Sequence, residues 1–161
     1  MRDEDFELLF ETHAQSLFAF LVYRTGDRAL AEDVLSDAFE RAMRSRRRFD
    51  PSRGDARNWL YTIALNRLRD LQRRSVVETR AVGELTATGS SDSPGFEDRV
   101  LDEQEVRAAM LSLSEEEREV LALRFGADMT VPEIARLVGE PLSRVEGRVY
   151  RGLRKLREHV G

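Results

Sequence analysis

Apolar residues recur every three or four positions through most of this chain, which is the spacing of a helix face that packs on a core. Three stretches of the first half carry this pattern, at residues 3–22, 28–42 and 55–71. The second half repeats it after Ser114-x-x-Glu117 and Thr130-x-x-Glu133, two sequences typical of a helix capping box. With only 10 Gly and 4 Pro in 161 residues, the pattern predicts an all-α protein.

The periodicity fades between residues 76 and 97, where the sequence ATGSSDSPG is small, polar and turn-forming. We therefore expect two small helical domains, residues 1–75 and 98–161, joined by a flexible linker at 76–97. Fully extended, this linker reaches roughly 75 Å.

The residue types that metal sites and disulfides need are scarce. The chain has no cysteine, and its two histidines, His13 and His159, lie far apart in sequence. The N-terminus is acidic where a signal peptide is basic, and no apolar run approaches membrane-spanning length. We also find no catalytic constellation and no Gly-rich phosphate loop. We expect a cytoplasmic protein that is not an enzyme, has no metal or cofactor, and does not insert into the membrane.

The net charge of −4 conceals two basic clusters. Arginines far outnumber acids between residues 41 and 74, and Arg and Lys dominate residues 144–157. Binding to a polyanion depends on the local field more than on the total charge. The clusters therefore point to nucleic acid, with ordinary solvated helix faces as the alternative.

A helix-turn-helix pattern leads into the second basic cluster. The short helix after Thr130 stops at Gly139, and Ser143-x-x-Glu146 has the form of a third capping box that opens the last helix. Opposite its apolar stripe, this last helix carries Arg144, Arg148, Arg151 and Lys155. A face of this kind can read base edges in a major groove and neutralise phosphates. The alternative is a solubilising surface.

The helix that we expect to start at Asp55 offers a different chemistry. Its outward face carries Thr62, Asn66, Arg69 and Arg73. The basic loop before it ends with Arg48 and Phe49. An aromatic ring beside amide and guanidinium groups suits the capture of an unpaired base by stacking and hydrogen bonding. Phe49 and Trp59 can instead be core residues, and composition favours that role for Trp59.

Three stretches resemble the two conserved regions of the extracytoplasmic-function sigma factors of bacterial RNA polymerase. They are AEDVLSDAFERA (31–42), FDPSRGDARNWLYTIALNRLRDLQRR (49–74) and LSEEEREVLALRFGADMTVPEIARLVGEPLSRVEGRVYRGLRKL (113–156). The resemblance covers nearly the whole chain outside the linker and preserves the order and spacing of both regions. It implies a transcription initiation factor with region 2 at residues 1–75 and region 4 at residues 98–161.

The resemblance also implies a role for each surface. The first domain would capture an unpaired base of the promoter −10 element through Arg48, Phe49, Thr62, Asn66, Arg69 and Arg73. The second would read −35 duplex DNA through Arg124, Ser143, Arg144, Arg148, Tyr150, Arg151 and Lys155. The acidic row Asp33, Asp37 and Glu40 would bind the clamp helices of the polymerase β′ subunit. The second domain would dock on the β flap of core RNA polymerase. Family members are commonly held inactive by an anti-sigma factor, which adds a partner besides core polymerase and promoter DNA.

Glu146 and Gly147 depart from the family pattern, which has a basic residue followed by Ser at these positions. Glu146 either completes the capping box of Ser143 or contacts DNA by accepting a hydrogen bond from cytosine N4. We interpret it as a cap. Both possibilities predict a −35 sequence that differs from that of typical relatives.

Two other functions compete with this interpretation. Residues 113–137 also resemble the output domain of two-component response regulators. That function leaves residues 31–42 and 59–70 unexplained, and the chain has no receiver domain. The other competitor is a sigma mimic that only sequesters an anti-sigma factor, and such a decoy does not need two basic faces.

Overall fold

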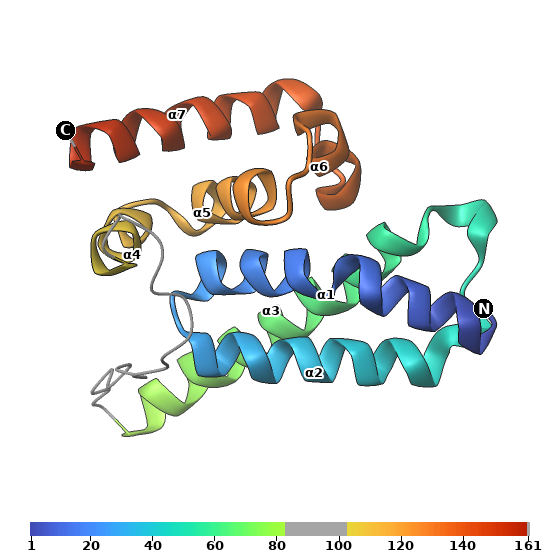
Figure 1. Cartoon of the computed structure of the whole chain (residues 1–161). Helices are drawn as coiled ribbons and strands as arrows, with labels where there is room; N and C mark the ends of the chain where they lie inside the picture. Colours follow the sequence, from blue (N-terminus) through green and yellow to red (C-terminus); the bar gives the residue numbers. More distant parts are fainter. Residues whose placement is uncertain (83–102, 161) are drawn as a thin grey trace.

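The computed structural model describes residues 1–82 and 103–160, and every regular element in these ranges is helical (Figure 1). The first half contains α1 (Asp3–Thr25), α2 (Arg28–Ser45), the 3-10 turns η1 (Arg46–Arg48) and η2 (Pro51–Arg53), and α3 (Ala56–Val82). The second half contains α4 (Glu103–Leu111), α5 (Glu115–Leu121), the π-helical turn η3 (Ala122–Gly126), α6 (Val131–Val138) and α7 (Leu142–Val160). The all-α prediction is confirmed.

Short polar side chains fix where several helices begin. The carboxylates of Asp27 and Asp55 accept backbone N–H groups at 3.2 and 2.7 Å, at the starts of α2 and α3. Both hydrogen bonds of the capping box are formed at Ser114 and again at Thr130. Gly139 ends α6 in the left-handed conformation, with φ 70°. These boundaries are local, and the sequence predicted the helices that follow residues 27 and 55, both capping boxes and the stop at Gly139.

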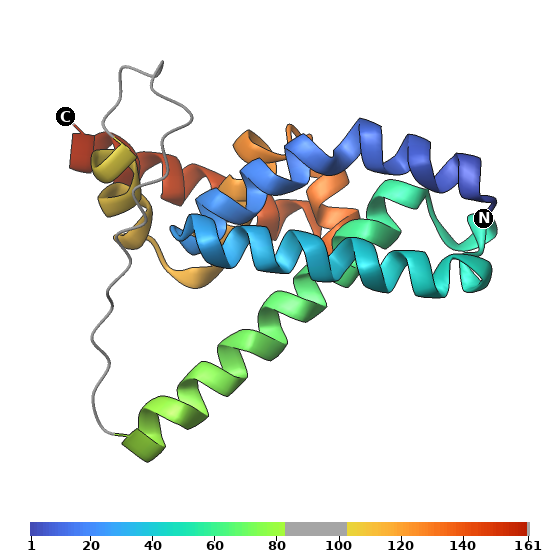
Figure 2. The same ribbon diagram turned by 60° about the horizontal axis from the view of Figure 1, so that its bottom comes forward.

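The last helix of the first half is longer than its apolar pattern indicated. α3 continues to Val82, so the predicted linker at 76–97 begins with a helical segment. Residues 83–97 of that linker lie outside the residues that the structure describes. Figure 2 shows the C-terminal part of α3 extending away from the other helices.

α1 is the element that joins the two halves. It packs on α2 and α3 on one side and on η3, α4 and α5 on the other (Figures 1 and 2). Leu17 and Phe20 of α1 are fully buried in one continuous core with Leu123 and Met129 of the second half. The apolar residues of α1 are distributed around its circumference, which is typical of a helix covered on several sides. The two helical halves therefore share their core in this structure.

Ion pairs also cross the boundary between the halves. Glu119 of α5 lies 3.8 Å from the buried Arg24 of α1 and 3.7 Å from Arg69 of α3. Arg57, in the first turn of α3, donates a hydrogen bond to Glu133 at the start of α6. Thus the N-terminal turn of α3 is tied to the first helix of the helix-turn-helix.

Candidate nucleic-acid interface

α3 presents a polar face that is open to solvent. Because α3 is a regular helix, residues three and four positions apart project from one side of it. The exposed residues of this face are Thr62, Asn66, Arg69 and Arg73. The hydroxyl of Thr62 donates to a carbonyl of its own helix at 2.7 Å. The structure therefore places the four predicted residues of α3 on one exposed face.

The aromatic residue predicted to stack on a base lies near the start of α3. Phe49 follows η1 and is half-buried, with its ring centre 5.1 Å from that of Trp59 at an interplanar angle of 50°. Trp59 packs partly buried against the core, as its composition-based interpretation favoured. Arg48, the preceding residue, is exposed. Phe49 thus keeps part of its ring accessible.

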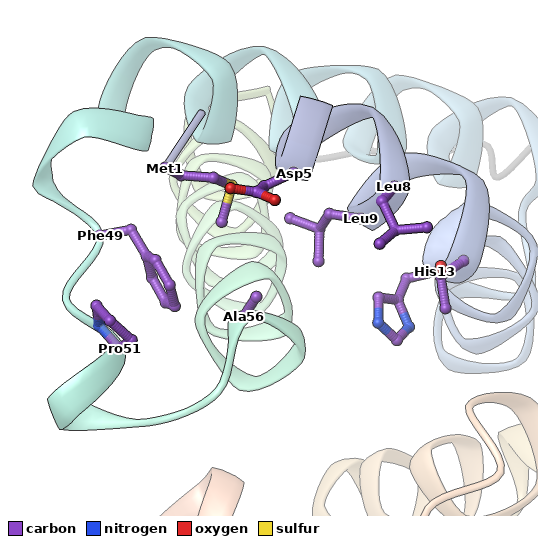
Figure 3. A pocket seen from close by; sticks show the side chains of 9 residues that line it. Met1, Asp5, Leu8, Leu9, His13, Phe49, Pro51 and Ala56 are labelled. Atoms are coloured by element: carbon purple, nitrogen blue, oxygen red, sulfur yellow. The ribbon is translucent and has the colours of Figure 1, made fainter. Parts of the chain in front are cut away.

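A shallow pocket of about 530 Å³ lies beside the Phe49 ring, between the N-terminal part of α1 and the turn η2 (Figure 3). Its walls are mainly apolar and include Leu8, Leu9 and Pro51, with His13 at one end. Burial and the nearby Arg57 guanidinium lower the pKa of His13, which favours the neutral imidazole. Asn66 is not among the residues that line this pocket. The structure therefore does not bring Phe49 and Asn66 together in one cavity.

The acidic row of α2 is divided between exposed and engaged carboxylates. Asp33 is exposed and makes no ion pair with a described residue. Asp37 accepts a 2.8 Å hydrogen bond from Arg67, whose side chain is only 16% exposed. Glu40 is exposed and pairs with Arg44 at 2.6 Å within the same helix. Asp37 therefore holds α2 on α3, whereas Asp33 and Glu40 face solvent.

The helix α7 carries four of the residues predicted to read duplex DNA on its solvent side. Ser143, Arg144, Tyr150 and Arg151 are all exposed, Tyr150 to 69%. Val145, fully buried, lies on the opposite side of the helix. This arrangement is that of the second helix of a helix-turn-helix, with its outer side free to enter a groove.

Arg148 is held by acids of its own domain. Its side chain is only 13% exposed, and its guanidinium donates two hydrogen bonds to Glu140, one of them at 3.0 Å. A third carboxylate oxygen, from Glu116, lies 3.6 Å away. The hydrogen bonds from Arg148 lower the pKa of Glu140. Arg148 thus connects the turn before α7 to α7 and to α5.

The remaining two predicted cations of the second half also have partners within the chain. Lys155 donates a 2.7 Å hydrogen bond to the buried carboxylate of Glu117. Burial opposes ionisation of Glu117, but the bonds from Lys155 and Ser114 outweigh it and lower its pKa. Arg124 is half-buried over the ring of Phe125 and donates to the carbonyl of Met129 at 3.4 Å.

The predicted capping box of Ser143 and Glu146 is wrong. α7 begins at Leu142, so Ser143 already lies inside the helix, and neither hydrogen bond of the box is formed among the described residues. Glu146 is exposed. Pro141, whose carbonyl accepts the first backbone bonds of α7, shifts the helix start by two residues.

Residues 1–82 and 103–160 contain no helix that is both long enough and apolar enough to span a bilayer. The same ranges contain no group of three or more side chains placed to hold a metal ion.

The sequence matches two families, described as "Sigma-70 region 2" over residues 9–76 and "Sigma-70, region 4" over residues 109–158. It is 36% identical to the RNA polymerase sigma factor CarQ of Myxococcus xanthus, over 97% of this chain and 89% of that protein. It is 30% identical to the ECF RNA polymerase sigma factor SigL of Mycobacterium tuberculosis, over 92% of this chain and 85% of that protein. The chain belongs to the extracytoplasmic-function sigma factors.

Solved structures share the fold of this sigma factor. The sigma factor RpoE of Bartonella quintana, solved with the anti-sigma factor NepR, is 22% identical with a TM-score of 0.85, covering 98% of this chain and 97% of that one. The sigma factor CnrH, solved with the cytosolic domain of CnrY, is 25% identical with a TM-score of 0.72, covering 99% and 89%. These matches extend over both halves of the chain.

Membership in the family establishes the general function. This sigma factor directs promoter-specific transcription initiation by RNA polymerase and is not itself an enzyme. The response-regulator interpretation fails because region 2 occupies residues 9–76.

Three charged residues of the interface between the halves were not anticipated. No pattern in the sequence predicted that Arg57, Glu119 and Glu133 form ion pairs between the halves. The capping-box pattern predicted that Glu133 interacts with Thr130, but no nearby residue in the sequence indicates its ion pair with Arg57.

Proposed function

We propose that this sigma factor reads its promoter with two separate surfaces, one for opened DNA and one for duplex DNA. The −10 surface consists of Arg48, Phe49, Thr62, Asn66, Arg69 and Arg73. The −35 surface consists of Ser143, Arg144, Tyr150 and Arg151, the exposed members of the predicted set on α7. Arg124, Arg148 and Lys155 support this second surface from partly buried positions.

The observation that supports the proposal most strongly is the separation of the two polar faces, one on α3 and the other on α7. On α3, an exposed amide and two guanidinium groups follow a partly accessible aromatic ring. Bases that leave the stack can be held by aromatic stacking and by hydrogen bonds to their edges. On α7, exposed arginines lie on the solvent side of the second helix of a helix-turn-helix. A helix with such a surface can bind in the major groove of duplex DNA.

Two exposed carboxylates of α2 give the proposed contact with polymerase. Asp33 and Glu40 are accessible, and we assign them to the clamp helices of the β′ subunit. Asp37 contributes by fixing the position of α2 through Arg67. The second domain docks on the β flap in the same assembly.

An anti-sigma factor completes the set of proposed partners. The structure of RpoE was solved with the anti-sigma factor NepR, and that of CnrH with the cytosolic domain of CnrY. The same kind of regulation suits this chain, acting in the cytoplasm where the polymerase is found.

Run-off transcription with purified core polymerase tests the proposal. The template is a promoter library with random −35 and −10 elements, and the control reaction contains core polymerase alone. We expect the complete chain to associate with core polymerase and to enrich one sequence at each element. Failure to associate with core polymerase would contradict the proposal, as would transcription that selects no sequence at either element.

A further inference from the structure

Glu146 is an exposed acid in a basic helix. It lies in the second turn of α7, and its side chain makes no hydrogen bond or ion pair with a described residue. The neighbouring acids Glu116, Glu117 and Glu140 all pair with cations of α7. Glu146 is the fifth residue of α7, beyond the first turn in which the helix dipole stabilises an acid. Neither capping nor ion pairing accounts for it.

The position of Glu146 places it at the outer side of the helix-turn-helix. The exposed Ser143 and Tyr150 lie three and four residues from it. With the half-buried Gly147 between them they complete an edge, called here the reading edge. A Cβ at Gly147 would approach only the flexible guanidinium of Arg151, at 3.1 Å. Gly147 itself adds no side chain beside Glu146. The Arg151 side chain that lies over Gly147 is flexible and can move aside, so a base pair can come close to the carboxylate.

A carboxylate on such a surface needs a donor from the DNA. Phosphates repel it, and burying it without a partner is unfavourable. In the major groove the base-edge donors are the amino groups of cytosine and adenine. Adenine also presents its own N7 acceptor beside the amino group, which repels a carboxylate, whereas cytosine presents N4–H₂ with no acceptor beside it on the same base.

We infer that Glu146 is a specificity-determining residue that selects a cytosine in the −35 element by accepting a hydrogen bond from its N4 amino group. The inference rests on the proposed function, because it requires α7 to enter the −35 major groove. Arg144 and Arg151 are also exposed on α7, on the other flank of the reading edge from Glu146, and their positive charges offset the repulsion between this helix's carboxylate and the phosphates. Arg148 does not neutralise Glu146, since Glu140 and Glu116 already hold it.

Selection from a library with a random −35 element, carried out with the complete holoenzyme, tests this inference. We expect the wild-type protein to enrich cytosine at one −35 position by about tenfold over the other bases. Glu146→Ala should remove that preference and leave the other positions unchanged. In Glu146→Gln the amide should shift the preference toward adenine, because a glutamine can bond adenine N6 and N7 together.

Glu158→Gln is the matched control, since it neutralises another exposed acid near the opposite end of α7. It should leave the cytosine preference intact. The inference is overturned if Glu146→Ala keeps the wild-type preference, or if the wild-type protein selects no cytosine within the −35 element. Wild-type holoenzyme that transcribes from a selected promoter would meanwhile uphold the proposed function. Absence of any promoter-dependent transcription would overturn both.

Discussion

Gly126 of η3 lies directly against the main chain of Phe20 in α1: a Cβ at Gly126 would be 2.8 Å from the Cα of Phe20 and 2.9 Å from its nitrogen. Main-chain atoms within a helix cannot rotate away as a side chain can. This close approach therefore requires glycine at position 126, and it sets how closely the second half packs on α1.

Gly126→Ala should force the two halves apart, at a cost of about 1–3 kcal/mol for overpacking. Because the chain has no cysteine, cysteines introduced at the exposed Ser36 and Ser143 can carry a donor and an acceptor dye. We expect lower energy transfer in Gly126→Ala. Gly147→Ala, whose Cβ would meet only the side chain of Arg151, should leave the transfer unchanged. Equal energy transfer in both variants would show that the interface between the halves accommodates the extra methyl group without separating.

Arg148→Ala should destabilise the helix-turn-helix, because the substitution leaves the carboxylates of Glu140 and Glu116 without their shared partner. We expect the free energy of unfolding to fall by about 1–2 kcal/mol, measured by urea denaturation. Promoter binding should weaken to a similar extent for every −35 sequence. Arg151→Ala removes an exposed arginine, so it should weaken promoter binding while stability stays the same. A changed −35 preference in Arg148→Ala, with wild-type stability, would instead make Arg148 a base-reading residue.

Asn66→Ala should impair promoter opening more than −35 binding. The exposed amide of Asn66 is assigned to the edge of an unpaired base, which is present only after the duplex has opened. Permanganate reactivity of −10 thymines measures opening, and a gel-shift assay of the holoenzyme measures promoter binding. Gln15→Ala removes another exposed amide, from α1, and should change neither measurement. Equal losses in opening and binding would contradict the proposed division between the two surfaces.

Asp33→Arg should weaken association with core polymerase by about tenfold or more, since it reverses the charge of an exposed carboxylate assigned to the clamp helices. The affinity can be measured by fluorescence anisotropy of the labelled sigma factor. The control is Glu32→Arg, which reverses an adjacent exposed acid on another side of α2. If both variants lose affinity equally, general electrostatic attraction explains the contact and Asp33 has no specific role.

The stability of the boundary between the halves should fall in acid. Hydrogen bonds from the backbone and hydroxyl of Thr130, together with Arg57, lower the pKa of Glu133 to about 2. An unfolded glutamate titrates near pH 4.3. A depressed pKa means that the stabilisation is complete above about pH 5 and is lost as the pH falls toward 2.

Glu133→Gln isolates this contribution, because a glutamine still accepts the capping hydrogen bond but carries no charge. Urea denaturation between pH 7 and pH 3 should show a smaller loss of stability in the variant than in the wild-type protein, by about 1 kcal/mol. Glu32→Gln, at an exposed acid, should follow the wild-type curve. A wild-type pH dependence in Glu133→Gln would mean that the ion pair with Arg57 contributes no stability.

The elements of this protein were predictable because they depend on neighbours in sequence. The caps at Asp27, Asp55, Ser114 and Thr130 each act across three residues, and the structure contains all four. The exception was Ser143, where the carbonyl of Pro141 starts the helix earlier than the side-chain pattern indicated. In that case two local signals competed, and the backbone geometry of the turn decided between them.

By itself, the sequence determined the helices, the helix-turn-helix and membership in the sigma factor family, since periodicity, caps and motifs are local properties of the chain. Only the tertiary structure decided which charges are accessible. In the folded chain Arg148 forms an ion pair with Glu140, and Arg57 forms one with Glu133, whereas the side chain of Glu146 is exposed to solvent. The physical reason is that an ion pair across two helices depends on how the helices cross and how close they come. Side chains that are far apart in the sequence set that geometry, and at this boundary the bare backbone of one glycine sets it too.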